Sequence, residues 1–182
     1  MIDILTVNDE IGCYPNSYYS ATTKLLAKFP TLSESVRCDV CVVGAGYTGL
    51  TSAINLAEHG YDVVVLEAHR VGFGASGRNG GQVSSGQRWS IEELEKCFGL
   101  ERTKILWDIG ESAKSEVQEK IRRYKIDCEY KPGIIHASLK EKLLKPQRDE
   151  VDKLIGRYNY KKIEYLDLSR IRDLIATNKY LG

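Results

Sequence analysis

The segment from residue 39 to residue 82 constrains this 182-residue chain more than any other. It opens with four apolar residues, 40–43, a run too short for a helix and typical of a buried parallel strand. Three glycines follow directly at the spacing G-x-G-x-x-G. In such a turn the first glycine allows a tight bend, the second lets a pyrophosphate approach the backbone, and the third lets the next helix pack close to the strand. The pattern predicts a phosphate-binding turn made of Gly44, Ala45, Gly46, Tyr47, Thr48 and Gly49.

The residues after the turn continue the same pattern. Apolar periodicity predicts a helix from Tyr47 to His59, ended by Gly60, whose first turn would offer free N–H groups and roughly half a positive charge to a phosphate. A second apolar run, 63–66, leads into Glu67, eighteen residues after the last glycine of the turn. An acid at about this distance bonds a ribose hydroxyl in dinucleotide-binding units. Strand, turn, helix, strand and acid together favour a βαβ nucleotide-binding unit over a chance glycine turn.

The glycine-rich stretch that follows bears on which dinucleotide is bound. Glu67 disfavours a cofactor with a 2′-phosphate, because the two negative charges would repel, and this leaves NAD and FAD. Six of the chain's sixteen glycines lie between residues 72 and 86. Such a segment exposes backbone N–H groups and can lie against a flat ligand. An NAD domain would continue into another helix instead, so the stretch favours FAD, with an NAD-dependent dehydrogenase as the alternative.

Three stretches of sequence carry a resemblance to a known family. They are CDVCVVGAGYTGL, YDVVVLEAHRVGFGASGRNGGQ and RYKIDCEYKPG. The chain resembles the amino-terminal part of the FAD-dependent D-amino-acid oxidase superfamily and would cover less than half of such an enzyme. The resemblance implies an incomplete α/β fold: a Rossmann-like FAD-binding βαβ domain, followed by the start of a mixed or antiparallel α+β substrate domain.

The resemblance also implies a reaction and a set of cofactor residues. The reaction is oxidation of an amine: a hydride passes from the carbon beside nitrogen to the flavin, the imine hydrolyses to an aldehyde, and oxygen reoxidises the flavin. Because the groups that bind substrate in these enzymes come largely from sequence absent here, no catalytic residue and no metal ligand is predicted. We expect Ser76 near the phosphates and 79–82 near the flavin ring. Beyond the turn itself, the predicted cofactor residues are Glu67, Ala68, Ser76, Gly77, Arg78, Asn79, Gly80, Gly81 and Gln82.

The sequence predicts an arm over 1–37, a partial FAD-binding domain over 38–125 and the beginning of a substrate domain over 126–182. The other helices expected are a patch at 21–28, a helix to Phe98 capped by Ser90, and a helix over about 101–124 with an apolar stripe that includes Ile109 and Val117. Strands are expected at 127–131, 134–138 and 161–166. Two further helices are expected, one with Pro146 in its first turn and a last one capped by Asp167 or Ser169.

Composition narrows the remaining classes of function. A net charge of +1 gives no electrostatic case for nucleic acid, and no apolar run approaches the ~20 residues of a membrane span. Five cysteines, an odd number, suggest no disulfide framework, and we expect Cys38, Cys41 and Cys128 to be buried or half-buried thiols. We therefore expect a cytoplasmic protein. The resemblance implies a small amine as substrate, and a second-half polypeptide or another copy of the chain as a possible partner. The alternative is a non-catalytic remnant, or a subunit whose partner supplies the missing half.

Overall fold

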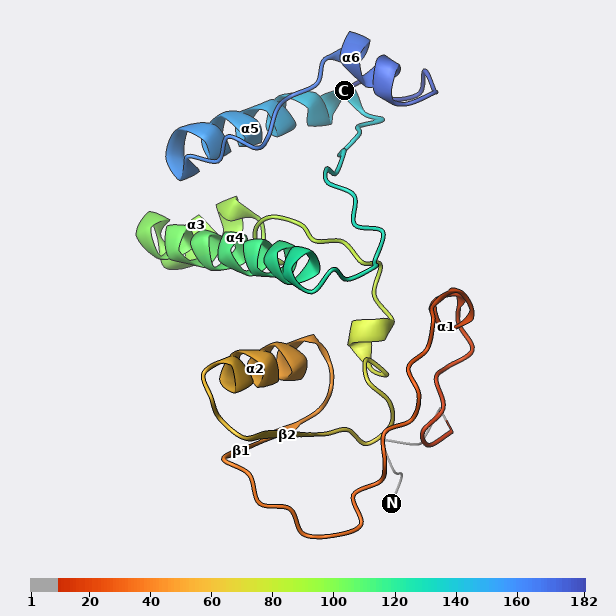
Figure 1. Ribbon diagram of the computed structural model, residues 1–182. Coiled ribbons are helices and arrows are strands. Elements are labelled where there is room, and N and C mark those ends of the chain that lie inside the picture. The colour runs from red at the N-terminus through yellow and green to blue at the C-terminus, as the bar shows by residue number, and fades with distance from the viewer. Residues whose placement is uncertain (1–9) are drawn as a thin grey trace, which may run out of the picture. The chain divides into compact units, whose positions relative to one another are not determined.

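The computed structural model describes residues 10–182, and the chain divides into two compact units, Met1–Gln82 and Val83–Gly182 (Figure 1). The first unit contains α1 (Tyr18–Thr22), β1 (Val40–Val43), α2 (Tyr47–Glu58), β2 (Val63–Leu66) and the 3₁₀ turn η1 (Ala75–Gly77). The second contains α3 (Ile91–Phe98), α4 (Leu100–Arg123), the 3₁₀ turn η2 (Glu141–Leu143), α5 (Leu144–Tyr158) and α6 (Leu168–Leu174).

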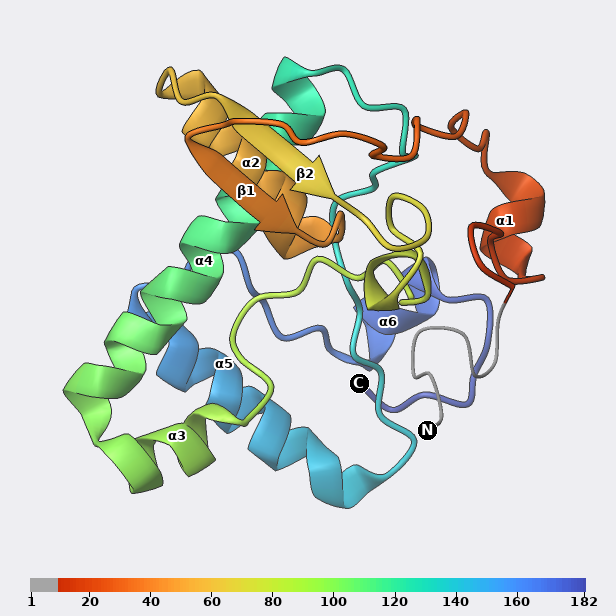
Figure 2. The same cartoon turned by 90° about the horizontal axis from the view of Figure 1, so that it is seen from below.

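The first unit is built on the predicted βαβ segment. Strands β1 and β2 pair in parallel, with Val40 opposite Val63 and Val43 opposite Leu66. Helix α2 lies against this small sheet (Figure 2). A Cβ added at Gly49 would lie 1.9 Å from the carbonyl oxygen of Gly44, so the helix approaches the strand as closely as a glycine permits. The described residues therefore contain the βαβ unit expected of a Rossmann-like fold, with a parallel sheet of two strands.

The sheet is only partly covered. Val43 is 84% exposed, and Cys41 beside it on β1 is also exposed. The expectation of buried or half-buried cysteines is thus wrong for Cys41, and it is wrong for Cys128, which is exposed as well. The five thiols are all free.

The arm before β1 contacts the segment that follows β2. The Tyr14 hydroxyl donates to the carbonyl oxygen of Val71 at 2.8 Å, and the Arg70 guanidinium lies 4.7 Å over the Tyr14 ring while it donates to the Leu26 carbonyl. The helical patch predicted at 21–28 is wrong for most of its length: α1 begins earlier, because Ser17 and Ser20 form a capping box at its start, and residues 24–28 are not helical.

The second unit has a small core between three helices. Ile91 of α3, Trp107 of α4 and Leu154 of α5 are buried together. Ser90 caps α3 through a capping box with Glu93, as predicted. Lys153 of α5 binds Glu92 of α3 at 2.6 Å, which joins these two helices at the surface.

Helix α4 packs through a different face from the one predicted. Thr103 and Trp107 are its buried residues, whereas Ile109 and Val117 are 57% and 41% exposed. The physical reason is the large ring of Trp107, which packs at 5.6 Å from Tyr158 and 5.2 Å from Tyr160, measured between ring centroids.

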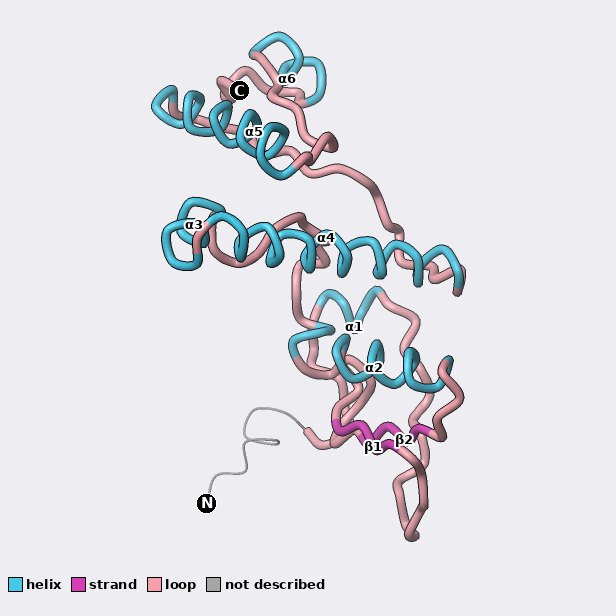
Figure 3. Tube along the Cα trace, turned by 90° about the vertical axis from the view of Figure 1, so that its left-hand side faces the viewer, coloured by secondary structure: helices cyan, strands magenta, loops and turns pink. Residues whose placement is uncertain are grey.

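The strands expected at 127–131, 134–138 and 161–166 are absent, so the predicted antiparallel sheet is not found in the described residues (Figure 3). An isolated hairpin is marginally stable in water. The Ser138 backbone instead bonds the end of the chain: its N–H donates to Gly182 at 2.7 Å, and its carbonyl accepts from Leu181 at 2.8 Å.

The last two helices begin as the sequence predicted. Pro146 lies in the first turn of α5, where its missing N–H costs no helical hydrogen bond. Asp167 caps α6 by accepting from the Arg170 N–H at 3.0 Å.

Candidate cofactor-binding site

The turn between β1 and α2 has the backbone geometry that its glycines predicted. Gly44 has φ +101°, a left-handed conformation that residues with a Cβ rarely adopt, and its N–H donates to the Leu66 carbonyl at 2.7 Å. Ala45 is 2% exposed. Gly46 is the N-cap of α2 and offers no side-chain cap, so the first N–H groups of this twelve-residue helix depend on acceptors from elsewhere.

One such acceptor is the Ser76 hydroxyl. Its Oγ accepts from the Tyr47 N–H at 2.9 Å, and a Cβ added at Gly46 would lie 2.9 Å from the same oxygen. The start of α2 therefore holds an oxygen atom in a space that only a glycine at position 46 leaves open. This is the geometry with which a helix N-terminus binds a phosphate oxygen.

Glu67 reaches the same turn from the end of β2. Its Oε2 accepts from the Ala45 N–H at 2.8 Å, and its Oε1 accepts from the His69 N–H at 2.9 Å. The structure thus brings Glu67 and Ser76, predicted from separate parts of the sequence, to the turn at residues 44–49.

The glycine-rich arm, residues 72–82, begins with a hydrogen bond to the turn at 44–49. The Gly72 N–H donates to the Ala45 carbonyl at 2.9 Å, a contact that sequence reasoning did not single out. Gly72 has φ +72°, and a Cβ added at Gly77 would lie 2.3 Å from the Gly72 carbonyl oxygen, so the loop folds closely on itself. Both positions require glycine. The high density of glycines between residues 72 and 86 is the sequence signal that could have revealed this close folding.

The remaining predicted residues are held locally. Asn79 Nδ2 donates to the carbonyls of Ala75 and Ser76 at 3.1 and 2.8 Å, and Asn79 Oδ1 accepts from the Gly81 N–H at 2.8 Å. Arg78 lies 4.6 Å over the Phe73 ring. A cofactor role for residues 78–82, Thr48 and Ala68 stays a prediction.

The residues present fit a dinucleotide. Gly46 leaves room beside the backbone of the turn, the first turn of α2 supplies N–H donors, of which the Tyr47 N–H donates to Ser76 Oγ, and Glu67 supplies two carboxylate oxygens for a diol. Among residues 10–182 no group of three or more His, Cys, Asp or Glu side chains could hold a metal ion.

Comparison with known proteins agrees with this reading of the turn. The family described as FAD dependent oxidoreductase matches residues 39–182. The chain is 44% identical over 169 residues to gamma-glutamylputrescine oxidoreductase of Escherichia coli, an alignment that covers 93% of this chain and 39% of that protein. It is 38% identical over 164 residues to the probable oxidoreductase OrdL of Rhizobium meliloti, covering 90% of this chain and 38% of the relative. No solved structure matches significantly.

The chain spans about two fifths of the length of these relatives. The part of the chain that the structure describes contains no helix long and apolar enough to cross a membrane.

Proposed function

This chain belongs to the family of FAD dependent oxidoreductases, and we propose that it forms the nucleotide-binding part of an enzyme that oxidises a C–N bond of an amine. One observation carries the cofactor proposal: the Ser76 hydroxyl and the Glu67 carboxylate both reach the glycine turn at the start of α2. In a dinucleotide-binding turn the pyrophosphate would lie beside Ser76, and the ribose would lie beside Glu67.

Each residue of the turn has a distinct role in this proposal. Gly46 and the first N–H groups of α2 bind the pyrophosphate, with Ser76 as an additional hydrogen-bonding partner. Glu67 accepts hydrogen bonds from the ribose hydroxyls in place of the Ala45 and His69 N–H groups. The arm at 77–82 runs on toward the flavin ring, where its backbone excludes water and orients the ring.

The substrate proposal rests on the relative named for gamma-glutamylputrescine. When bound, FAD supplies the hydride acceptor, which no side chain of the chain can replace. We propose a primary or secondary amine of the gamma-glutamylputrescine type as substrate, positioned largely by polypeptide beyond these 182 residues.

A second candidate is a subunit that requires another polypeptide. The 84% exposure of Val43 on the sheet favours it, because an uncovered apolar strand is ordinarily paired or buried. In this case the chain binds FAD tightly only when the partner is present.

Titration with FAD tests the cofactor proposal directly. The purified chain is titrated with FAD, with NAD added in a parallel series, while flavin fluorescence and visible absorption are followed. We expect saturable binding of FAD with a perturbed flavin spectrum, and no displacement by equimolar NAD. Tight NAD binding without FAD binding would replace the proposal with an NAD-dependent dehydrogenase.

A further inference from the structure

The segment that precedes β1 contacts the residues that come shortly after Glu67. The Tyr14 hydroxyl donates to the Val71 carbonyl at 2.8 Å. The Arg70 guanidinium lies 4.7 Å from the centroid of the Tyr14 ring, and it also donates a hydrogen bond to the Leu26 carbonyl. Tyr14 is therefore bound both through the face of its ring and through its hydroxyl.

His69 is bound by the same segment. Its Nδ1 accepts from the Gly12 N–H at 3.4 Å, and its ring stacks on Phe73 with 4.0 Å between the ring centroids. Residues 12–26, which we call the N-terminal segment, thus contact each of the three residues 69–71. The contacts differ in kind, because one is made by a backbone N–H, one by a phenol hydroxyl and one by a cation over an aromatic ring.

The residues 69–71 are also joined to the glycine turn at both of their ends. On one side the His69 N–H donates to Glu67 Oε1 at 2.9 Å, while Oε2 of the same carboxylate accepts from the Ala45 N–H at 2.8 Å. On the other side the Gly72 N–H donates to the Ala45 carbonyl at 2.9 Å. One of the two N–H groups that hold the Glu67 carboxylate therefore belongs to residues that the N-terminal segment holds in place.

This arrangement orients the carboxylate before any nucleotide is bound. Glu67 is exposed, and an exposed glutamate side chain ordinarily exchanges among several rotamers. Here both of its oxygens are held by N–H groups, so the side chain has less conformational freedom to lose when ribose hydroxyls take the place of those groups. The N-terminal segment contributes by keeping the His69 N–H in position.

We propose that Tyr14 is a positioning residue for the nucleotide: together with Arg70 it holds residues 69–71, so that the Glu67 carboxylate is oriented before the ribose binds. The premise is the proposed function, in which Glu67 binds the ribose. Tyr14 does not touch the nucleotide, and its effect reaches the ribose only through Glu67. All of these residues belong to the first compact unit.

The test uses nucleotides that differ only at the ribose. FAD and ADP carry both ribose hydroxyls, whereas 2′,3′-dideoxy-ADP carries neither and offers Glu67 no donor. Tyr14→Phe removes only the hydroxyl that bonds Val71. In calorimetric titrations of the full chain it should weaken the binding of FAD and ADP by roughly twofold to tenfold and leave the binding of 2′,3′-dideoxy-ADP unchanged. Arg70→Met, which removes the cation from the Tyr14 ring, should show the same pattern.

Two further measurements follow the effect along its path. Amide hydrogen exchange at 69–72 should be faster in Tyr14→Phe than in the unaltered chain. The double variant Glu67→Ala/Tyr14→Phe should bind FAD as Glu67→Ala does, because Tyr14 acts through Glu67. Tyr18→Phe is the matched control: Tyr18 lies in the same segment, is 76% exposed and packs edge-on against Tyr19, so its loss of a hydroxyl should change none of these values.

The outcomes separate this inference from the proposed function. If the unaltered chain binds FAD and Tyr14→Phe binds FAD and ADP equally well, the inference is overturned while the proposed function stands. It is overturned in the same way if 2′,3′-dideoxy-ADP is weakened as much as ADP, because the effect then does not pass through the ribose. If the unaltered chain binds no FAD, the proposed function fails and the inference fails with it.

Discussion

Glu67 is the side chain that joins the end of β2 to the glycine turn, because its two oxygens accept from Ala45 and His69. We predict that Glu67→Ala weakens FAD binding at least tenfold, since loss of one partner of a charged hydrogen bond costs on the order of 1.5–3 kcal/mol. Glu67→Gln retains one acceptor oxygen, so its affinity for FAD should lie between that of the unaltered chain and that of Glu67→Ala. Fluorescence titration measures the affinity, with Glu34→Ala in the exposed part of the arm as control. Equal affinity in Glu67→Ala would remove this carboxylate from the site.

The two glycines at 46 and 49 should respond differently to substitution. At Gly46 an added Cβ meets the Ser76 side chain, with the hydroxyl oxygen at 2.9 Å, whereas at Gly49 an added Cβ lies 1.9 Å from the backbone oxygen of Gly44. We predict that Gly46→Val abolishes FAD binding but keeps most of the helix content, and that Gly49→Ala also destabilises the first unit, by about 1–3 kcal/mol. Circular dichroism and thermal unfolding separate the two effects. FAD binding retained by Gly46→Val would contradict the phosphate-turn assignment.

Between elements, the contact of α5 with α3 gives the second unit a dependence on pH. The hydrogen bond from Lys153 lowers the pKa of Glu92 from its usual 4.5, and the same bond raises the pKa of Lys153 above its usual 10.5. The pair's contribution is therefore present between these two values. It is lost as the pH falls through the lowered pKa of Glu92, and again as the pH rises through the raised pKa of Lys153.

We predict that Lys153→Met lowers the stability of the second unit by up to about 1 kcal/mol at pH 7, because the Glu92 side chain is 56% exposed and solvent screens the pair. Thermal unfolding from pH 3 to pH 8 should show this difference shrinking below pH 4.5. Lys145→Met, which removes an exposed pair within α5, is the control and should change little. A difference that persists unchanged at pH 3 would show that the methionine acts by packing instead.

The elements that the sequence predicted well are those fixed by local chemistry. The turn at 44–49, the Ser90 and Asp167 caps and the place of Pro146 depend on neighbouring residues, and the structure has each of them. The packed face of α4 and the fate of 127–138 depend on distant partners, Tyr158 and Tyr160 in one case and the chain end at 181–182 in the other. Periodicity and turn signals carry no information about such partners. The strands predicted within 127–138 are therefore absent from the structure, and the packed face predicted for α4 is wrong.

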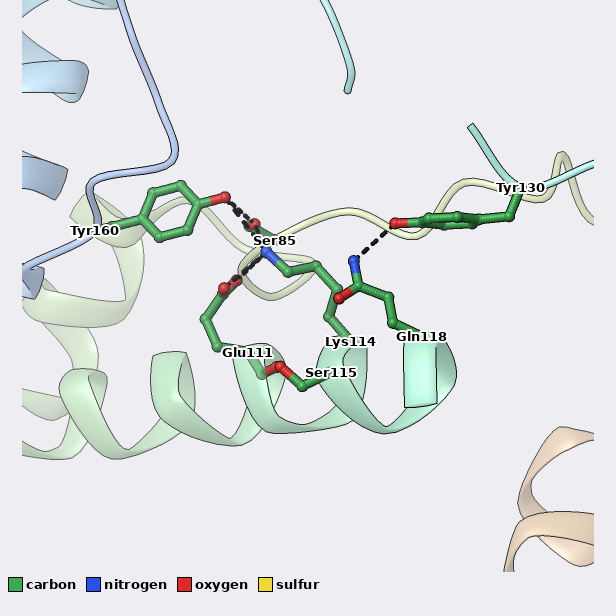
Figure 4. A network of polar contacts seen from close by, with 7 residues as sticks. All are labelled: Ser85, Glu111, Lys114, Ser115, Gln118, Tyr130 and Tyr160. Atoms are coloured by element: carbon green, nitrogen blue, oxygen red, sulfur yellow. Dashed lines mark hydrogen bonds and ion pairs between the residues drawn. The ribbon is translucent and has the colours of Figure 1, made fainter. Parts of the chain in front are cut away.

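The site divides in the same way. Glu67 and Ser76 were predicted from spacing and resemblance, and the structure places both at the turn. By contrast, Ser85 is hydrogen-bonded to Lys114 and Tyr160, which lie 29 and 75 positions after it in the sequence (Figure 4). No motif in the sequence marks these contacts.

Taken as a whole molecule, the chain exposes apolar side chains on both of its units. Val43 of β1 is 84% exposed in the first, and Ile105 and Ile109 of α4 are 59% and 57% exposed in the second. Apolar surface of this kind favours association with another polypeptide. We expect the purified 182-residue chain to associate at micromolar concentration, or to gain stability when polypeptide matching the remaining length of its relatives is supplied.

The last prediction is that this chain alone does not sustain turnover. A doubly wound nucleotide-binding fold holds its ligand at a crevice between strands, and the described residues supply two parallel strands, β1 and β2. Positioning of the reacting groups contributes several kcal/mol to catalysis, and the proposed function assigns most of the amine-binding groups to polypeptide outside these 182 residues. The test is to add excess FAD and gamma-glutamylputrescine to the chain in the presence of oxygen and to measure peroxide. Sustained peroxide formation by a monomer would show that these 182 residues already contain the substrate-binding groups.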